Sequence, residues 1–345
     1  MIYLDNAATS HPKPDRVYAR VEEFLRGVGA NPGRGSHRMA VEAEACIASV
    51  RRSLAEMFGC REPSRIIFTL NATDALNMAL KGVLASGDHV VTTVLEHNSV
   101  ARPLERMERE GRIRVTRLEP GPDGAIDPDR VEGAITPATR LVVIGHAGNV
   151  LGTVQPIREI GAIVRRRGGL FAVDAAQSAG IIPIDVEEDR IDLLAFTGHK
   201  TLMGPQGTGG LVVGERVEPA PWREGGTGGD SANPLQPDEL PHRLEAGTPN
   251  TAGIAGLGEG VRYVRENSGE MARHETALAS RLWEALEGRR GISLHGHRPG
   301  DGRPRTGVVS FTMAGHTASE VGAILDSSFG IAVRAGLHCA PGTHR

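Results

Sequence analysis

The chain has 345 residues, of which 39% are hydrophobic and 23% are charged, and its formal net charge at pH 7 is −3. This length is too great for one ordinary hydrophobic core, and the composition is typical of a globular protein. The charge balance excludes a strong basic field for nucleic acids or membranes, and no apolar run reaches the ~18 residues that span a bilayer.

The cysteines and the N-terminus indicate where the protein works. Cys46, Cys60 and Cys339 have neither the spacing of a zinc site nor that of a disulfide framework. The N-terminal stretch MIYLDNAATSHPKP lacks the basic and apolar segments of a secretory signal. We therefore expect a cytoplasmic protein in a reducing compartment, with no metal site, no membrane anchor and no nucleic-acid partner.

Between about residues 40 and 215, short β-branched runs alternate with amphipathic stretches. The pattern predicts strands over 65–69, 88–94, 113–118, 140–146, 170–176, 192–199 and 209–214. It predicts helices over 73–84, 99–110, 127–135 and 156–168. Strands that alternate with helices favour a mainly parallel sheet covered on both faces, and ligands of such sheets bind beyond the carboxyl ends of the strands.

The second part of the chain begins with a stretch rich in proline and glycine, residues 215–250, for which we expect a long functional loop. Beyond it, the sequence predicts helices near 252–266 and 269–288, a strand over 307–313 and a helix over 317–328. This organisation predicts a large domain over residues 16–240. A smaller α+β domain would combine residues 1–15 with residues 241–345.

The segment AFTGHKTLMGPQGTGGL places Lys200 where an apolar strand enters a glycine-rich loop. Most lysines are exposed, but burial at this position would lower the pKa of the amine. A neutral amine is what Schiff-base formation requires.

Asp174 ends the apolar run LFAV, at the carboxyl end of a predicted strand. A carboxylate there could pair with a pyridine nitrogen and make the ring an electron sink, although capping of a helix is the rival interpretation. Gln177, three residues further on, could donate to a phenolate oxygen.

Two more candidates follow earlier strands. Thr73 opens a predicted helix, whose N–H groups could bind a phosphate, but it could equally be a plain N-cap. His97 stands just past the next strand and could stack on a flat ring, whereas a surface histidine is the default interpretation. Together with Lys200 and Asp174, these residues predict a pyridoxal phosphate site at one edge of the sheet.

Segments spread along the whole chain carry a family resemblance: YLDNAATS, NPGRGSHRMA, EHNSV, VDAAQSAG, TGHKTLMGPQGTGGL, EAGTPN and RAGLHCAP. Together they resemble the cysteine desulfurase/selenocysteine lyase family, which is pyridoxal phosphate-dependent and has the class V aminotransferase fold. The resemblance runs from residue 2 to the end of the chain. It implies the α/β architecture of fold type I, with a mainly parallel seven-stranded sheet in the large cofactor-binding domain beside the smaller α+β domain.

The resemblance also implies roles for particular residues. Lys200 would carry the cofactor and then act as acid and base, His97 would stack on the pyridine ring, and Cys339 would be the nucleophile. The other implied cofactor contacts are Ala72, Thr73, Thr197 and His199 at the phosphate, Asp174 at the ring nitrogen, and Gln177 at the phenolate oxygen. Asn149 and Arg334 would lie at the substrate. Thr248 would reach the phosphate of the neighbouring subunit, which implies a homodimer with shared active sites.

The implied reaction is a sulfur transfer. L-cysteine would give its sulfur to Cys339 as a persulfide and leave as alanine, so that a lone cysteine near the end of the chain would be more than a buried structural thiol. Arg334, with His338 as a further candidate, would favour the thiolate, and Cys46 and Cys60 lack such surroundings. The persulfide would pass to an acceptor protein. Iron–sulfur cluster assembly, tRNA thiolation and molybdenum cofactor sulfuration all start from the same persulfide.

Two alternatives stand beside this interpretation. One is a selenocysteine lyase, acting on L-selenocysteine, or another lyase or aminotransferase of the same fold. The other is a non-catalytic scaffold, against which the presence of every cofactor residue argues.

One departure from the family concerns the C-terminus. Members of the family continue past the cysteine, through an arginine that clamps the substrate carboxylate, to a strand and a final helix, whereas this sequence stops at Arg345. We therefore expect the C-terminal part of the small domain to be missing. We also expect the chain to bind its cofactor well and to turn over L-cysteine poorly, because an arginine–carboxylate contact is among the stronger polar contacts.

Overall fold

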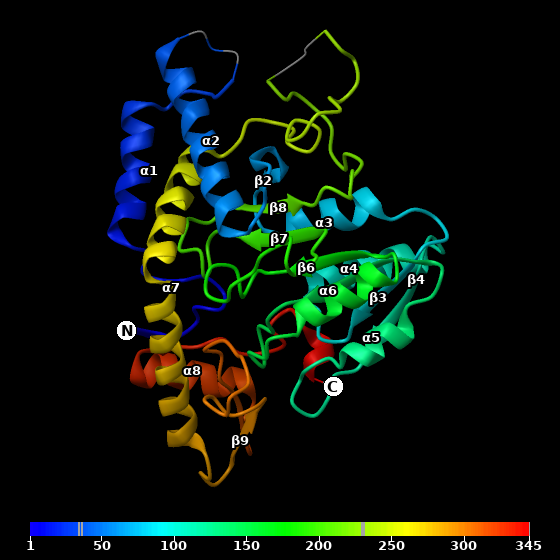
Figure 1. Cartoon of the computed structure of the whole chain (residues 1–345). Coiled ribbons are helices and arrows are strands. Elements are labelled where there is room, and N and C mark those ends of the chain that lie inside the picture. The colour runs from blue at the N-terminus through cyan, green and yellow to red at the C-terminus, as the bar shows by residue number, and fades with distance from the viewer. Residues whose placement is uncertain (34, 36, 229–231, 345) are drawn as a thin grey trace.

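The structure is a computed structural model, and it describes residues 1–33, 35, 37–228 and 232–344. Its centre is a seven-stranded sheet in the order β2-β8-β7-β6-β5-β3-β4 (Figure 1). The strands are β2 (Ile66–Thr69), β3 (His89–Thr93), β4 (Arg114–Leu118), β5 (Thr139–Gly145), β6 (Leu170–Asp174), β7 (Leu193–Thr197) and β8 (Gly209–Val213). Within this sheet β8 alone runs opposite to the rest, because it pairs antiparallel with both β2 and β7. The predicted fold class, with a mainly parallel seven-stranded sheet, is confirmed.

Helices cover both faces of this sheet. They are α2 (Arg38–Met57), α3 (Ala72–Val83), α4 (Asn98–Arg109), α5 (Pro128–Ala134) and α6 (Ile157–Arg166). Along β6, Phe171 and Val173 pack with α2, α5 and α6, whereas Leu170 and Ala172 pack with α3 and α4. Alternate side chains of one strand thus enter two separate hydrophobic cores, which is why the strands read as continuous apolar runs.

A single helix, α7 (Thr251–Leu286), occupies the region where the sequence predicts two. The predicted break near residues 267–268 is therefore wrong. Asn267 does not leave the helix but donates its Nδ2 to the carbonyl oxygen of Tyr263, one turn earlier, at 2.8 Å. The first half of α7 packs against α1 (Asp15–Gly27) and α2, so tertiary packing extends the helix through a turn-like sequence (Figure 1).

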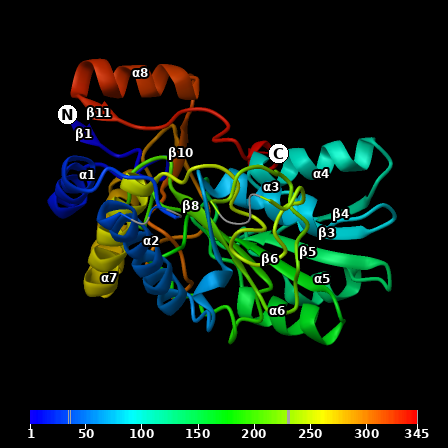
Figure 2. The same ribbon diagram turned by 90° about the horizontal axis from the view of Figure 1, so that it is seen from above.

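The remaining strands form two small sheets of two strands each, and one further helix, α8, lies among them in the chain. β9 (Ile292–His295), which the sequence does not predict, pairs antiparallel with β10 (Ser310–Met313), the shortened form of the strand predicted over 307–313. α8 (Ala318–Phe329) begins with a capping box between Thr317 and Glu320. β1 (Ile2–Tyr3) pairs in parallel with β11 (Ile331–Ala332), so the N-terminus lies beside β11 and α8 (Figure 2). The domain boundaries stay a prediction.

The long loop between β8 and α7 contains neither helix nor strand in its described part, residues 214–228 and 232–250. Among the described residues, no helix combines the length and apolarity needed to cross a membrane. The same residues contain no cluster of three or more His, Cys, Asp or Glu side chains placed to hold a metal ion.

Candidate active site

The candidate site lies at one edge of the central sheet. Because β2, β3, β5, β6 and β7 run in the same direction, their carboxyl ends share that edge. The start of α3 follows β2, and His97 follows β3. Asp174 is the last residue of β6, and Lys200 stands three residues beyond β7. The topology therefore gathers residues that lie up to 128 positions apart in the sequence, from Ala72 to Lys200.

Lys200 lies in the turn after β7, in an environment that favours its neutral form. Burial lowers the pKa of this amine. The negative charges of Asp174 and Cys339 act against that shift, and the positive charge of Arg334 acts with it. These interactions show that β6 and the C-terminal segment both approach Lys200. An amine with a lowered pKa can act as a nucleophile and as a base near neutral pH.

Asp174 is 8% exposed and faces the same space. Burial raises the pKa of its carboxyl group, whereas Lys200 and His97 lower it. Oδ1 accepts the N–H of Ala176 at 2.9 Å, which is a two-residue Asx turn. No helix starts at this point, so the rival interpretation of Asp174 as a helix cap is wrong.

His97 is the N-cap of α4, and a hydroxyl relay joins it to α3. Its Nδ1 accepts the N–H of Ser99 at 3.1 Å, which places the ring proton on Nε2. The hydroxyl of Ser99 lies 2.8 Å from Nδ1 of His97 and 2.7 Å from Oγ1 of Thr73. Burial lowers the pKa of His97, while Asp174 raises it. The imidazole is therefore neutral near pH 7, and its contacts with Ser99 fix the orientation of the ring.

The N-terminus of α3 is built as an anion-binding end. Asn71 is the N-cap, since its side chain accepts the N–H of Asp74 at 3.0 Å, and the alternative of Thr73 as a plain N-cap is therefore wrong. The β7–β8 turn closes on this end, because a Cβ on Gly209 would lie 2.8 Å from Cα of Asn71. This close approach requires glycine at position 209. The N–H groups of Ala72 and Thr73, in the first turn of α3, can donate hydrogen bonds to an anion at this end of the helix.

Two further residues of the site lie at the end of β7 and just beyond it. Thr197 is 2% exposed, and its hydroxyl lies 3.5 Å from the carbonyl oxygen of Thr208. His199 has a buried Nδ1 without a hydrogen-bond partner among the described residues. Burial lowers the pKa of His199 to about 4, so its ring is neutral. A buried polar atom without a partner is costly, and it marks a position that a ligand can satisfy.

The C-terminal segment lies over the same edge of the sheet and carries the exposed Cys339. The carbonyl oxygen of Cys339 accepts the N–H of Asn98 at 2.7 Å. The carbonyl oxygen of His338 accepts Nδ2 of Asn149 at 2.6 Å. Both residues have positive φ, 51° for His338 and 59° for Cys339, which is an uncommon conformation for side chains other than glycine. The segment is thus bound to the first residue of α4 and to the loop after β5. Figure 2 shows the C-terminus beside α3 and α4.

Two cationic groups were expected beside Cys339. The guanidinium of Arg334 lies 3.8 Å from the carboxylate of Asp5, and its field reaches both Lys200 and His97. Burial, followed by the charges of Arg334 and His344, lowers the pKa of His338. His338 is therefore neutral near pH 7, and the expectation that it adds positive charge is wrong. Arg345 lies outside the described residues.

The structure places two predicted residues differently from the rest. Gln177 is buried, and its Nε2 donates to the carbonyl oxygen of Ala7 at 2.9 Å, so its amide faces the N-terminal segment. Thr248 is exposed in the loop before α7. No hydrogen bond in the described part of the chain joins Thr248 to the residues of the site.

Sequence reasoning missed two ionisable groups near the site. Glu96 is 4% exposed, and burial raises the pKa of its carboxyl group to about 8. The amine of Lys13 donates to the carbonyl oxygen of His199 at 2.6 Å. The position of Glu96 between a strand end and His97 was a usable signal. The sequence held no signal for Lys13, because its contact spans 186 residues.

Comparison with known proteins decides the family. The model of the class-V aminotransferases matches residues 2–345. The chain belongs to this family.

Its relatives narrow the assignment. A protein named probable cysteine desulfurase, from Methanothermobacter thermautotrophicus, is 36% identical over 98% of this chain and 84% of its own length. The apo structure of a cysteine desulfurase from Thermococcus onnurineus has a TM-score of 0.89 and 34% identity, and the match covers 99% of this chain and 86% of that one. The structure of SspA in complex with cysteine has a TM-score of 0.78 and 28% identity, with 100% and 95% of the two chains covered. Class-V aminotransferases of the cysteine desulfurase kind depend on pyridoxal phosphate, and this chain groups with them.

Proposed function

We propose that the chain is a cysteine desulfurase, a sulfurtransferase that uses pyridoxal phosphate to convert L-cysteine into L-alanine and leaves the sulfur on Cys339 as a persulfide. The observation that carries this proposal is the meeting of three groups at one sheet edge. The Lys200 amine has a lowered pKa, Asp174 is a buried carboxyl group beside it, and the charge of Cys339 acts on Lys200 from the C-terminal segment.

The residues of the site fit pyridoxal phosphate. The N–H groups at the start of α3, Thr73 and the unpartnered Nδ1 of His199 suit a phosphate, with Thr197 nearby. Asp174 suits the ring nitrogen, and the imidazole of His97 suits the face of the ring. The amide of Gln177 donates to Ala7 and would have to turn from it to reach the phenolate oxygen. When bound, the cofactor withdraws electrons from the Cα of the amino acid.

Lys200 and Asp174 divide the proton chemistry between them. The Lys200 amine, whose pKa burial lowers, can take the Cα proton of the substrate and return it. The Asp174 carboxyl group, buried and held by the N–H of Ala176, keeps a proton on the ring nitrogen. Arg334 of the C-terminal segment and Asn149 of the loop after β5 would face the substrate.

Cys339 receives the sulfur. Its thiolate attacks the sulfur of the bound substrate, and the S–S bond forms as the Cβ–S bond breaks. The electron pair of the broken bond stays on carbon, and protonation of that carbon completes alanine. The exposure of Cys339 lets the persulfide meet an acceptor protein.

The partners follow from the same proposal. We propose L-cysteine as substrate, a sulfur-acceptor protein as receiver, and a homodimer in which Thr248 of each subunit serves the other subunit's cofactor phosphate. The cysteine-bound neighbour and the desulfurase relatives support L-cysteine. The alternative of a selenocysteine lyase gains no support from these relatives. A cytoplasmic location stays a prediction from cysteine usage.

The test is alanine release from L-cysteine by the cofactor-loaded chain with a thiol reductant present. We expect alanine from the wild-type chain, and a loss of at least about a hundredfold in Cys339→Ser, because a hydroxyl cannot accept sulfur in place of a thiolate. Cys60→Ser is the matched control and should retain full activity, because burial raises the pKa of that thiol. Alanine release that does not depend on Cys339 would contradict the proposal.

A further inference from the structure

Lysine is rare in this chain. Three of its 39 lysine and arginine residues are lysines, namely Lys13, Lys81 and Lys200. Lys81 is exposed, with its amine 5.6 Å from the centre of the Trp222 ring. Lys200 has the role proposed above. No role has been assigned to Lys13. Most cationic residues of this chain are arginines, so a lysine here provides a compact amine with three hydrogen-bond donors in place of a planar guanidinium.

Lys13 binds the main-chain carbonyl group of His199 directly and that of Lys200 through the hydroxyl of Ser10. Its Nζ donates to the carbonyl oxygen of His199 and to the hydroxyl of Ser10, each at 2.6 Å. The Ser10 hydroxyl in turn donates to the carbonyl oxygen of Lys200 at 2.8 Å. Thr9 adds a hydroxyl donor to the His199 oxygen at 3.0 Å. Five residues, Thr9, Ser10 and Lys13 of the N-terminus and His199 and Lys200 of the β7 turn, thus form one hydrogen-bonded unit.

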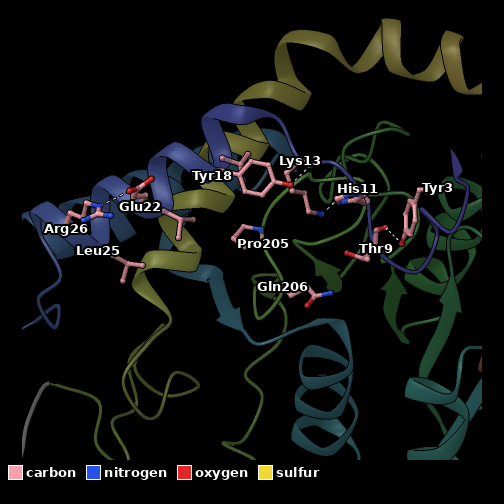
Figure 3. Close-up of a pocket in the computed structure, with 13 residues that line it drawn as sticks. Tyr3, Thr9, His11, Lys13, Tyr18, Glu22, Leu25, Arg26, Pro205 and Gln206 are labelled. Atoms are coloured by element: carbon pink, nitrogen blue, oxygen red, sulfur yellow. Dashed lines mark hydrogen bonds and ion pairs between the residues drawn. The ribbon is translucent and has the colours of Figure 1, made fainter. Parts of the chain in front are cut away.

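The amine of Lys13 is half-buried and forms no ion pair with a carboxylate of the described residues. Burial lowers its pKa to about 8. It lines a cavity of about 800 Å³ between the N-terminal segment, α1 and Pro205, through which solvent reaches it (Figure 3). The other titratable groups on that cavity are Tyr3, His11, Tyr18, Glu22 and Arg26, and outside its lining the amine contacts the carbonyl oxygen of His199.

We propose that Lys13 positions Lys200: its ammonium group, together with the Ser10 hydroxyl, holds the main chain of His199 and Lys200 so that the cofactor stays bound. Hydrogen bonds from a charged donor are roughly twice as strong as those from a neutral donor. The side chain of Lys200 has to move during the reaction, so a rigid main chain keeps that motion within the site. The proposal rests on the assigned role of Lys200.

The strength of the hydrogen bonds from Lys13 depends on pH, because the amine can lose its proton. The ammonium form predominates below about pH 8, and above that pH the amine donates as a neutral group. The main chain of His199 and Lys200 is therefore held more weakly on the alkaline side. Lys13→Arg keeps the charge at every such pH, and Lys13→Met removes it at every pH.

The experiment follows the rate at which bound cofactor leaves the loaded protein, read by its absorbance, from about pH 6.5 to about pH 9.5. We expect release from the wild type to accelerate through about pH 8. Lys13→Met should release cofactor about tenfold faster at pH 7, without that acceleration, because it loses a charge-assisted hydrogen bond. Lys13→Arg should lack the acceleration, and Lys81→Met should behave as the wild type.

A second measurement needs no cofactor. Amide hydrogen exchange of the peptide over residues 193–204 should be faster in Lys13→Met than in Lys81→Met at pH 7. Equal exchange and equal cofactor release in these two variants would overturn the proposal while leaving the desulfurase function intact. A wild-type chain that binds no cofactor would instead refute the proposed function, and the exchange comparison would still decide the role of Lys13.

Discussion

Glu96, after β3, and Asp174, at the end of β6, are two buried carboxyl groups at the same sheet edge, with β5 between their strands. Oε1 of Glu96 accepts the hydroxyl of Thr93 at 2.8 Å and the N–H of Gly145 at 3.2 Å, and Gly145 pairs with Asp174 in the β5–β6 register. Oε2 of Glu96 is buried without a partner among the described residues. Burial, with a further contribution from the charge of Asp174, raises the pKa of Glu96 to about 8. Glu96 is therefore mainly uncharged near pH 7, and the carboxyl group that faces Lys200 is that of Asp174.

Replacing Glu96 by glutamine should stabilise the protein near neutral pH. The pKa of Glu96 is raised on folding, so its contribution to stability is complete below about pH 4.5 and is lost progressively towards pH 8. At pH 7 the carboxyl group is ionised in the unfolded chain but mainly protonated in the folded protein. This difference lowers the free energy of unfolding by up to about 3 kcal/mol. Urea unfolding of Glu96→Gln should show a gain over the wild type that grows between about pH 5 and about pH 8.

The control for this prediction is Glu270→Gln, on an exposed position of α7, which should leave the pH profile of stability unchanged. A profile of Glu96→Gln that runs parallel to the wild type would mean that Glu96 is ionised in the folded protein.

The residues of the site differ in how far the sequence reveals them. Lys200, Asp174 and His97 each stand within four residues of the end of an apolar run, and the structure places all three at the predicted edge of the sheet. Their roles stay predictions. Glu96 and Lys13 become notable only through burial and through contacts with distant segments, which no local pattern encodes.

At the scale of elements, one ion pair connects the loop before α7 to the sheet. Arg51 of α2 forms a two-pronged contact with Glu245, at 2.8 and 2.9 Å, and its guanidinium also donates to the carbonyl oxygen of Ile66. Oε1 of Glu245 accepts the N–H of Phe68 at 2.6 Å. The pair is mostly buried, with side-chain exposures of 10% and 19%. It thus fixes the segment before Thr248 against β2, the strand that leads into α3.

Glu245→Gln should lower the free energy of unfolding by about 3 kcal/mol, because it leaves the Arg51 charge buried without its partner. The matched control is Glu110→Gln, which breaks the exposed pair with Arg106 and should cost less than about 0.5 kcal/mol. Urea unfolding midpoints at pH 7 measure both. The double variant Arg51→Met/Glu245→Leu should recover part of the loss, and no recovery would show that the Phe68 hydrogen bond dominates.

Most elements follow from sequence periodicity, and the exceptions have physical reasons. The segment around Asn267 carries turn-forming residues, yet packing of α1 and α2 on α7 carries the helix through it. β9 is missed because it is four residues long, has no buried face, and pairs with β10 alone. Its sequence ISLH does alternate apolar and polar residues, but four residues are too few for that alternation to distinguish a strand from a loop.

For the whole molecule, the sheet order shows where sequence reasoning reaches its limit. The reversed direction of β8 does not follow from its composition, because β8 is fully buried like the parallel strands β6 and β7. It follows from the connection instead: residues 198–208 between β7 and β8 contain no helix, and a parallel return would need a longer crossover. This turn carries His199 and Lys200, so the reversal also builds the site.

The proposed dimer can be tested through the placement of Thr248. The residue is exposed, it lies two positions before Asn250, the N-cap of α7, and the Arg51–Glu245 pair holds the loop that leads to it. A hydroxyl in this position is free to serve a second subunit. We expect the purified protein to sediment as a dimer, and Thr248→Val to bind pyridoxal phosphate more weakly because the phosphate loses one hydrogen bond, an effect of about 1 kcal/mol.

Mixed dimers decide whether Thr248 acts across the interface. Chains carrying Lys200→Ala and chains carrying Thr248→Val, purified as heterodimers through two affinity tags, contain two kinds of site if Thr248 serves its partner. One site then has both Lys200 and Thr248 intact, and the other lacks both, so half of the sites should bind cofactor with wild-type affinity. If Thr248 acts within its own subunit, every site lacks one residue, and a titration followed by cofactor absorbance should find no site of wild-type affinity. The two arrangements therefore give different numbers of tight sites from the same pair of substitutions.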